Sequence, residues 1–260
     1  MLTRQRKNLV LDRLARDGRI VARALAAELA LSEDTIRRDL RELAAAGQLQ
    51  RVHGGALPAA PADADLVARA DSASASKRAV GRAAAALVEP DQVIIVDGGT
   101  TALQLVAHLP VDRPLTVVTH SPSIAVALAA HRAVRVVMIG GQLYRHSMVN
   151  VGASAVEAMA HVRADRFFMG VTGLDPEAGL STGDLEEAHV KRALSRRAAE
   201  TVVLASAEKL NVASSYVVMP LDEASGVVID AGAPAPLVAS LKRAGLEVHR
   251  AEPIAPADRP

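Results

Sequence analysis

The run from Ser32 to Leu40 constrains the fold of this chain more than any other part of the sequence. Ser32 is a residue type that caps helix N-termini, and two acidic residues follow it, where the helix dipole favours anions. Ile36, Leu40 and Leu43 then recur at helical spacing. The pattern predicts an amphipathic helix that buries one apolar stripe.

The opposite face of this predicted helix is polar and basic. Arginine side chains in such a place can hold DNA phosphates or make bidentate contacts to guanine edges. The alternative is an ordinary helix with a charged, solvated face, and the run taken alone does not decide between the two. The residues off the apolar stripe are Thr35, Arg37, Arg38 and Arg41.

The sequence before this helix favours the DNA-binding interpretation. Apolar residues predict a first helix that ends at Gly18 and a second helix over residues 22–29. Residues 30 and 31 then leave only a tight connection to Ser32. Two helices joined in this way form a helix-turn-helix, whose second helix enters the major groove of DNA.

A short hairpin is predicted after the third helix. Gly47 ends that helix, residues 49–52 suit a strand, and Gly54-Gly55 permits a tight turn. A two-stranded wing of this kind carries Arg51 and His53 beside the recognition helix. The N-terminal module is therefore predicted to be a winged helix.

Residues 6–57 closely resemble the N-terminal domain of DeoR-type bacterial transcriptional regulators. The family pattern is an arginine near the start, a serine opening the third helix, Thr-Ile-Arg-Arg-Asp-Leu within it, and then His-Gly-Gly-Ala. This sequence carries the pattern at Arg6, at Ser32, over 35–40 and over 53–56. The resemblance implies that the winged helix binds operator DNA. The residues assigned to DNA contact are Arg6, Ser32, Thr35, Arg37, Arg38, Arg41, Arg51 and His53.

Charge is distributed unevenly along the chain, although the formal net charge is only +1. Residues 1–55 hold 11 Lys and Arg against 7 Asp and Glu, whereas the remainder holds 19 against 22. A basic head on a mildly acidic body suits a DNA-binding module joined to a separate sensing domain. The length of 260 residues fits one or two domains, and 50% hydrophobic residues are enough for a core.

Several classes of protein are excluded or disfavoured. The chain has no cysteine, which rules out disulfide scaffolds and thiolate zinc sites. The N-terminus lacks a long apolar run, and no stretch of about 18 uncharged apolar residues occurs. We therefore expect a soluble cytoplasmic protein with no membrane partner. Nucleotide-binding glycine motifs, a His-Glu-x-x-His helix and a nucleophile elbow are missing as well, so we expect neither a cofactor nor a metal.

The remainder of the chain alternates short apolar strands with helices. This alternation predicts an α/β domain with a mostly parallel sheet covered on both faces. We expect a winged helix-turn-helix over 1–57, a Pro/Ala/Asp-rich linker over 58–72, the α/β domain over 73–252 and a tail over 253–260. The predicted strands are 93–96, 115–119, 135–139, 166–169, 201–205 and 226–229. The predicted helices are 77–88, 102–108, 123–130, 153–160, 185–200 and 236–244.

A phosphate cradle is predicted where the first of these strands ends. In an open α/β fold, ligands bind beyond the carboxyl ends of the strands. The run Asp97, Gly98, Gly99, Thr100, Thr101 leads from that strand into a helix. Glycine backbone, free helix N–H groups and two hydroxyls can there surround an anion. A turn kept for packing alone is the alternative.

Small or hydroxyl-bearing residues follow the next strands as well. Five successive strand ends of this kind suggest one shared pocket, although each Gly-Gly pair alone also suits a loop hinge. Lys209, after the fifth strand, supplies a cation to it. Ser121 is also expected to cap the helix that begins at Pro122. The other residues assigned to the pocket are His120, Gly141, Gly170, Thr172 and Gly173.

This second domain resembles the DeoR-type effector domain, which is itself similar to ribose-5-phosphate isomerase. Residues 97–101 match the family's Asp-Ser-Gly-Thr-Thr, with Gly98 in place of the serine. In the isomerases the corresponding loop holds a phosphate with the help of two lysines, and the resemblance places Lys77 and Lys209 at those positions. A solvated helix face is the alternative for Lys77. The resemblance implies a phosphorylated sugar as effector.

Three departures from these patterns bear on function. Thr172 stands where the isomerases place acidic side chains, and His120 and Ser206 replace the family's usual asparagine and aspartate. Glu187 and Lys191 remain in the helix aligned with the isomerases' catalytic glutamate. Proton transfer between sugar carbons also needs electrophilic partners, which the sequence does not supply. Catalysis is therefore disfavoured, and the identity of the effector stays open.

These observations together predict a two-domain transcriptional regulator, a repressor of a carbohydrate-utilisation operon that a phosphorylated sugar releases from DNA. A sugar-phosphate isomerase or deaminase with an accessory DNA-binding head is the alternative, and a scaffold protein leaves the glycine-rich strand ends unexplained. Half-sites on double-stranded operator DNA require paired heads, so a homodimer or homotetramer is expected. The sugar, the operator sequence and the sign of regulation stay open.

Overall fold

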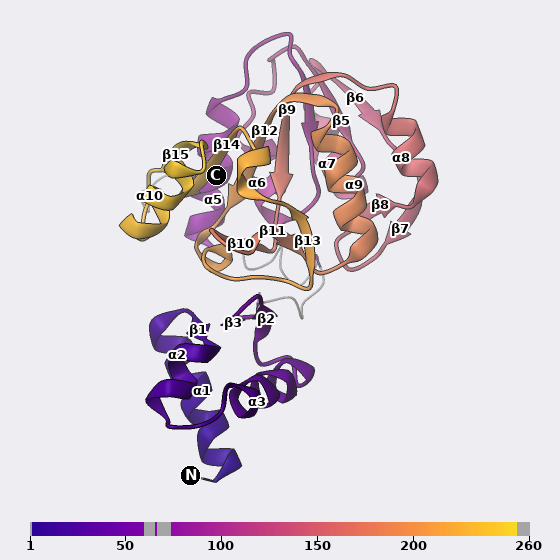
Figure 1. Cartoon of the computed structure of the whole chain (residues 1–260). Coiled ribbons are helices and arrows are strands. Elements are labelled where there is room, and N and C mark those ends of the chain that lie inside the picture. The colour runs from indigo at the N-terminus through magenta and orange to yellow at the C-terminus, as the bar shows by residue number, and fades with distance from the viewer. Residues whose placement is uncertain (1, 60–65, 67–73, 254–260) are drawn as a thin grey trace.

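The computed structural model describes residues 2–59, 66 and 74–253. Residues 2–59 form a small head and residues 74–253 a larger body, drawn below and above in Figure 1. The predicted linker and tail fall almost wholly outside the described residues. Within the described part, no helix is long and apolar enough to cross a membrane.

The head is the winged helix that the sequence predicts. Ile36 and Leu40 of the third helix share one buried core with Val10 of the first. The hydroxyl of Ser32 accepts the backbone N–H of Thr35 at 3.2 Å, which caps the third helix. The three short strands form an antiparallel sheet in the order β1-β3-β2. The elements are α1 (Thr3–Asp17), β1 (Ile20–Val21), α2 (Ala22–Glu28), α3 (Glu33–Ala45), β2 (Gln50–Val52) and β3 (Gly55–Leu57).

Two glycines set the ends of these elements. Gly18 stops α1 in the left-handed region, with φ of 72°, and its N–H bonds to the carbonyl oxygen of Leu14 at 2.9 Å. Gly54 turns the wing with φ of 77°. An L side chain is strained at such angles, so both turns need glycine.

The body is built on a seven-stranded sheet in the order β15-β14-β12-β9-β4-β5-β6, in which every neighbouring pair is parallel. The parallel pairing of these strands confirms the mostly parallel sheet that the sequence predicts. The strands are β4 (Val93–Val96), β5 (Leu115–Thr119), β6 (Val134–Met138), β9 (Ala164–Gly170), β12 (Ala198–Ala205), β14 (Gly226–Asp230) and β15 (Glu247–Ala251).

Both faces of this sheet are buried. Phe167 and Phe168, the only two phenylalanines of the chain, are adjacent in β9 and belong to different cores. Side chains alternate across a strand, so consecutive apolar residues need cover on both sides. Helices α5 and α6 contribute to one core, and α8, α9 and α10 to the other. The helices are α5 (Ala75–Ala86), α6 (Thr100–Ala107), α7 (Pro122–Ala127), α8 (Ala153–Met159), α9 (Leu185–Ser195) and α10 (Ala235–Arg243), with short 3-10 turns at η1 (Leu128–Ala130), η2 (Ala207–Lys209) and η3 (Leu221–Glu223).

The structure shifts several predicted boundaries and adds strands that were not predicted. The helix expected over 185–200 ends at Ser195, and residues 198–200 instead begin β12. Most of the missed strands are short, and the longest, β15, carries charged residues that interrupt an apolar run. The missed strands are β1 of the head, the hairpin β7 (Gln142–Tyr144) and β8 (Val149–Val151), the edge strand β15, and an antiparallel sheet of β10 (Gly173–Asp175), β11 (Gly179–Thr182) and β13 (Tyr216–Met219).

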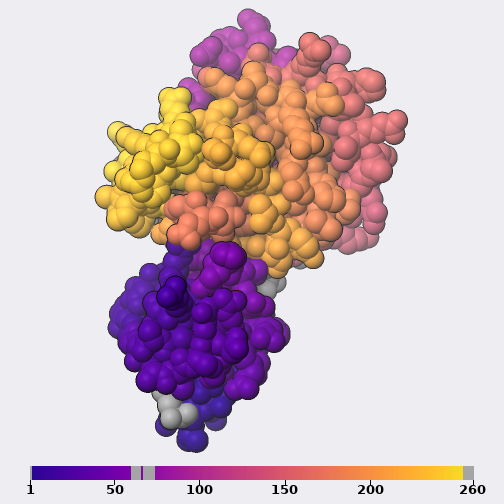
Figure 2. Space-filling model, viewed as in Figure 1, coloured from indigo at the N-terminus to yellow at the C-terminus, as the bar shows by residue number. Residues whose placement is uncertain are grey.

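Head and body are in contact in this structure, as the space-filling view in Figure 2 shows. Arg19 of the head forms ion pairs with Asp175 and Glu177 of the body. Ala59, just after β3, forms a parallel β-bridge with Ala213. The antiparallel sheet of the body therefore lies next to the wing.

Candidate functional site

The outer face of α3 carries the basic side chains that the sequence assigned to DNA. Arg37, Arg38 and Arg41 are exposed, and Thr35 is half-buried at the start of the helix. Arg37 Nη2 lies 2.6 Å from Glu33 Oε1 of the preceding turn. A surface pair of this kind is worth at most about 1 kcal/mol, so it does not prevent Arg37 from turning to a phosphate.

Arg6 does not lie on that face, and its expected place among the DNA contacts needs revision. Its guanidinium is 6% exposed and makes a two-pronged ion pair with Asp39, which is fully buried. Arg6 Nη2 donates to Asp39 Oδ1 at 3.0 Å. The pair joins α1 to α3, so we assign Arg6 to orienting the recognition helix. The sequence shows the arginine and aspartate of the family pattern but not that they meet.

The wing holds the last two DNA candidates. Arg51 and His53 are exposed on β2 and on the turn that follows it. Both also line a cavity of about 410 Å³ between head and body, together with Glu177 and Ser214. The wing side chains thus face the body in this arrangement.

Asp97 is the centre of a buried charged cluster at the carboxyl end of β4. Its carboxylate accepts backbone N–H groups of Gly98 at 2.8 Å and of Gly170 at 2.9 Å. It also accepts His120 Nε2 at 2.8 Å and Lys191 Nζ at 2.5 Å. Burial by itself raises the pKa of Asp97, but the charge of Lys191 and the hydrogen bond from His120 outweigh burial and lower it well below its ordinary value. Asp97 is therefore an ionised structural hub.

Lys191 connects this cluster to α9. Its ammonium lies 3.1 Å from Glu187 Oε1, and Ser147 Oγ donates to Glu187 Oε2 at 3.2 Å. Burial lowers the pKa of Lys191, yet the charges of Asp97 and Glu187 prevail and raise it. The two ring nitrogens of His120 face acceptors, Asp97 Oδ1 and the carbonyl oxygen of Asn150 at 2.9 Å, so both donate only when the ring is protonated.

A second group of residues converges at the N-terminus of α6. Lys209 Nζ lies 3.4 Å from Thr101 Oγ1, and Lys77 Nζ lies 3.6 Å from Glu208 Oε1. Lys77 is 8% exposed, which rules out the solvated helix face as its environment. Gly99 precedes Thr100 with φ of 111°, a conformation that opens the helix N-terminus and favours glycine. The cradle turn and Lys209 are thus brought together from α6 and η2, and Lys77 of α5 lies beside Glu208, the neighbour of Lys209.

Gly98 explains one departure from the family pattern. A Cβ at this position lies 2.3 Å from Cγ1 of Val149, in β8. The serine of the family pattern therefore does not fit here unless Val149 moves. The cradle turn of this chain therefore lacks the serine hydroxyl, and the β7–β8 hairpin packs closely against Gly98.

Four other assigned residues serve different local contacts. Thr172 Oγ1 lies 2.6 Å from Ser214 Oγ and donates to the carbonyl oxygen of Ser181 at 3.2 Å. Gly173 lies against the same region, because a Cβ there meets the carbonyl oxygen of Val212 at 2.5 Å. The other two lie beside the β7–β8 hairpin.

Gly141 approaches Val151 of β8 and Ala155 of α8. Ser121 precedes α7, and Pro122 begins that helix as expected, but the Ser121 side chain makes no cap. Its hydroxyl instead donates to the carbonyl oxygen of Met148 at 2.9 Å. Both residues therefore hold the hairpin in place.

Comparison with known proteins agrees with both halves of this geometry. Residues 6–60 match the DeoR-like helix-turn-helix domain, and residues 72–231 match the DeoR C-terminal sensor domain. The chain belongs to the DeoR family. It is therefore a DNA-binding transcriptional regulator and not a sugar-phosphate enzyme.

Individual relatives of this DeoR-family chain are regulators. The HTH-type transcriptional regulator GlpR of Haloferax volcanii is 32% identical over 251 residues, covering 95% of this chain and 98% of that protein. The HTH-type transcriptional repressor GlcR of Bacillus subtilis is 30% identical, covering 88% and 89%. The L-fucose operon activator of Escherichia coli is 29% identical, covering 86% and 94%.

Two of the solved structures to which this DeoR-family chain is similar share little sequence with it. Ribose 5-phosphate isomerase A of Methanocaldococcus jannaschii has a TM-score of 0.37 at 17% identity, covering 52% of this chain and 53% of that chain. The sorbitol operon regulator SorC of Klebsiella pneumoniae also has a TM-score of 0.37, at 14% identity, covering 80% and 96%.

Sequence reasoning missed most of the charged cluster of this DeoR-family protein. Lys191 and Glu187 were noted only as remnants of an enzyme-like helix, and Ser147 and Asn150 were not noted. A signal did exist, because Glu187 and Lys191 are an i,i+4 pair beside the apolar residues of α9. Lys191 and Asp97 are 94 positions apart in the chain, so no local sequence pattern predicts their contact.

Proposed function

We propose that this regulator represses a carbohydrate-utilisation operon and that a phosphorylated sugar, bound in the body, releases it from operator DNA. The domain limits that we propose are 1–57 for the DNA-binding head and 73–252 for the sensor. Acting on genomic DNA, it works in the cytoplasm. Paired half-sites require paired heads, so the active form is a homodimer or homotetramer.

The observation that carries the effector assignment is the convergence at the N-terminus of α6. Lys209 meets the hydroxyl of Thr101 there, next to the glycine turn. Lys77 of α5 lies 3.6 Å from Glu208, the neighbour of Lys209. Helix N–H groups and nearby cations favour an anion with several acceptor oxygens, which a phosphate offers. We also propose His120, Ser121, Gly141, Gly170, Thr172 and Gly173 for the wider effector pocket. His120 and Gly170 bond to Asp97 beside the turn, whereas the other four make the separate contacts described above.

For the DNA contacts we propose the exposed arginines of α3 with the wing. Arg37, Arg38 and Arg41 project from the helix that a winged helix places in the major groove. Ser32 and Thr35 at the helix start suit phosphate contacts, and Arg51 and His53 serve from the wing. Arg6 acts only through its ion pair with Asp39.

The alternative of an isomerase or deaminase is disfavoured by the state of the one base candidate. Glu187 is held by Lys191 and by Ser147, and it is 6% exposed. A general base must reach a substrate proton directly or through one water. This carboxylate is instead committed to the charged cluster.

The test is a DNA-release assay with a panel of sugar phosphates and the matching free sugars. The probe is the DNA upstream of the protein's own gene. We expect at least one sugar phosphate to lower operator affinity by roughly 5–150-fold and its free sugar to be far weaker. The variant with Thr100→Leu and Thr101→Leu should bind DNA normally and lose the response.

Release by free sugars or nucleotides, with no sugar phosphate active, contradicts the effector assignment while leaving DNA binding intact. Lack of DNA binding by the wild type to any upstream fragment contradicts the regulator assignment for these genes. Conversion of a sugar phosphate that Glu187→Gln abolishes would establish the enzyme instead. The matched control is Thr116→Leu, a threonine within β5 away from the cradle, which tests for a general effect on folding.

A further inference from the structure

Strand β10 connects residues 170–172, which lie beside the proposed effector cradle, to a turn of the body that contacts the head. Gly170, whose N–H bonds to Asp97, ends β9, and Thr172 immediately precedes β10. Asp175 ends β10 and pairs with Arg19 of the head, with Asp175 Oδ1 3.2 Å from Arg19 Nη2. Gly170 and Asp175 are five positions apart in the chain, and residues 173–175 of this connection are the strand β10. This short connection is the route by which we expect a change at Gly170 to reach the partner of Arg19.

Backbone hydrogen bonds orient the carboxylate of Asp175 toward Arg19. Its Oδ1 accepts the backbone N–H groups of Glu177 at 3.0 Å and of Ala178 at 2.9 Å, and its side chain is only 5% exposed. Arg19 also pairs with Glu177, which lies on the turn between β10 and β11. Arg19 of the head thus forms ion pairs with two acidic side chains at one turn of the body.

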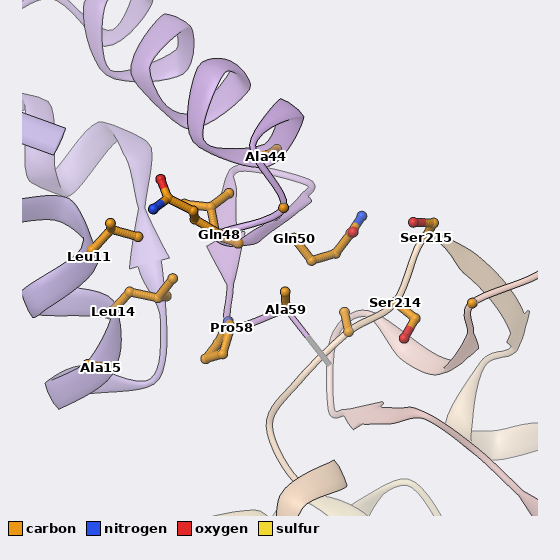
Figure 3. Close-up of a pocket in the computed structure, with 14 residues that line it drawn as sticks. Leu11, Leu14, Ala15, Ala44, Gln48, Gln50, Pro58, Ala59, Ser214 and Ser215 are labelled. Carbon is orange, nitrogen blue, oxygen red and sulfur yellow. The ribbon is translucent and has the colours of Figure 1, made fainter. Parts of the chain in front are cut away.

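A second connection runs beside the first. Thr172 Oγ1 lies 2.6 Å from Ser214 Oγ, and Ala213, the residue before Ser214, forms a β-bridge with Ala59. Ala59 follows the wing strand β3 after two residues. Figure 3 shows Ala59 between the head side chains and Ser214 and Ser215 of the body. Residues 170–172 are consequently connected both to the α1–β1 turn, through Asp175 and Arg19, and to the end of the wing, through Ser214 and the Ala59–Ala213 bridge.

The same arrangement places two wing residues that we propose for DNA contact beside the body. Arg51 and His53 border a cavity of about 410 Å³, closed on its other side by Glu177, Ser214 and other residues of the body. Glu177 thus places an acidic side chain beside the basic residues of the wing, where it opposes the approach of DNA phosphates.

We propose that this clasped arrangement of head and body is the autoinhibited, DNA-free form, and that the bound effector favours it through β10. The inference rests on the proposed function, since it gives the conformation through which the effector acts. In the DNA-bound form the Arg19 contacts and the Ala59–Ala213 bridge open, and the wing turns away from the body. A ligand shifts such an equilibrium only if it binds one form better. The proposal therefore requires that residues 170–172, which join the cluster around Asp97 to β10, differ between the two forms.

A disulfide lock tests the proposal. The chain has no cysteine, so Ala59→Cys with Ala213→Cys introduces a single possible pair. Adjacent strands of a sheet lie about 4.7–4.9 Å apart, within the Cα separation that a disulfide spans. We expect the oxidised double variant to bind the upstream DNA at least tenfold more weakly than its reduced form. Each single-cysteine variant should be unaffected by the oxidant.

The outcomes separate this inference from the proposed function. Equal affinity of the oxidised, cross-linked protein and its reduced form overturns the autoinhibited arrangement and leaves the regulator assignment in place. Failure of the reduced protein and of the wild type to bind any upstream DNA overturns the proposed function, and the inference with it.

A second variant tests the clasp without a new bond. Arg19→Ala removes both ion pairs and should raise operator affinity of the effector-free protein about five- to tenfold. Arg16→Ala is the matched control, because Arg16 is exposed in the last turn of α1 and pairs only with its neighbour Asp17. An unchanged or lowered affinity for Arg19→Ala, relative to Arg16→Ala, overturns the clasp.

Discussion

Replacing Lys191 with methionine should destabilise the body by about 3–5 kcal/mol, the usual cost of breaking a buried ion pair. The ammonium lies 2.5 Å from Asp97 and 3.1 Å from Glu187, and its side chain is 3% exposed. Methionine keeps most of the length and the apolar stem of lysine. It leaves two buried carboxylates with one counter-charge fewer.

The structure divides this cost unequally between the two carboxylates. Asp97 keeps three donors, from Gly98, Gly170 and His120, whereas Glu187 keeps only Ser147. Most of the penalty therefore falls on Glu187. Adding Glu187→Gln to Lys191→Met should recover about 1–2 kcal/mol, within the range of coupling for residues in contact.

Urea unfolding followed by far-UV circular dichroism measures these differences, since the chain has no tryptophan to report by fluorescence. The matched control is Arg192→Met, a half-buried cation on the same helix, which should change stability by no more than about 0.5 kcal/mol. A loss below about 1 kcal/mol for Lys191→Met, or a double variant weaker than the single one, would refute the charge argument.

Three further predictions concern the head and the acid response. Arg38→Ala should weaken operator binding by about 1–3 kcal/mol if the side chain reads a base edge, and gel shifts on operator variants distinguish this from a uniform loss through phosphate. Arg6→Met should destabilise the head by about 3–5 kcal/mol in urea titrations by leaving Asp39 buried and unpaired, and unchanged stability contradicts its structural role. Asp97 has a folded-state pKa below the unfolded value of about 3.9, so it stabilises the fold above that pH and the stability is lost as the pH falls toward the folded pKa. Unfolding titrations from about pH 5 to pH 2 should show a steeper decline for the wild type than for Asp97→Asn, and parallel curves would argue against this ionised carboxylate.

Local patterns in the sequence were enough to predict the head in detail. The spacing of Ile36, Leu40 and Leu43, the cap at Ser32 and the turn at Gly54 each act within a few residues. Local interactions of this kind determine helices and tight turns almost without regard to the rest of the chain. The first two strands of the body matched their predicted ranges for the same reason, since β4 and β5 are short apolar runs with turns at both ends.

Other parts of the fold could not be predicted from local patterns. Residues 198–200 continue the helical pattern of α9 in sequence, yet they pair with β9 as the start of β12. Pairing with a distant strand outweighed helix propensity there, as tertiary context often does. The strands β10, β11 and β13 are stabilised mainly by one another, and each is too short to be recognised alone.

The sequence by itself determined which chemical groups this protein carries at the ends of its strands and on its recognition helix. Tertiary structure alone decided which of those groups meet. Arg6 lies against Asp39 and not on the DNA face. Lys191 contacts Asp97, which is 94 positions away in the chain, and Arg19 pairs with the turn after β10. The reason is physical: buried charges must find partners, and the partner is set by which elements pack together, not by which residues are neighbours in the chain.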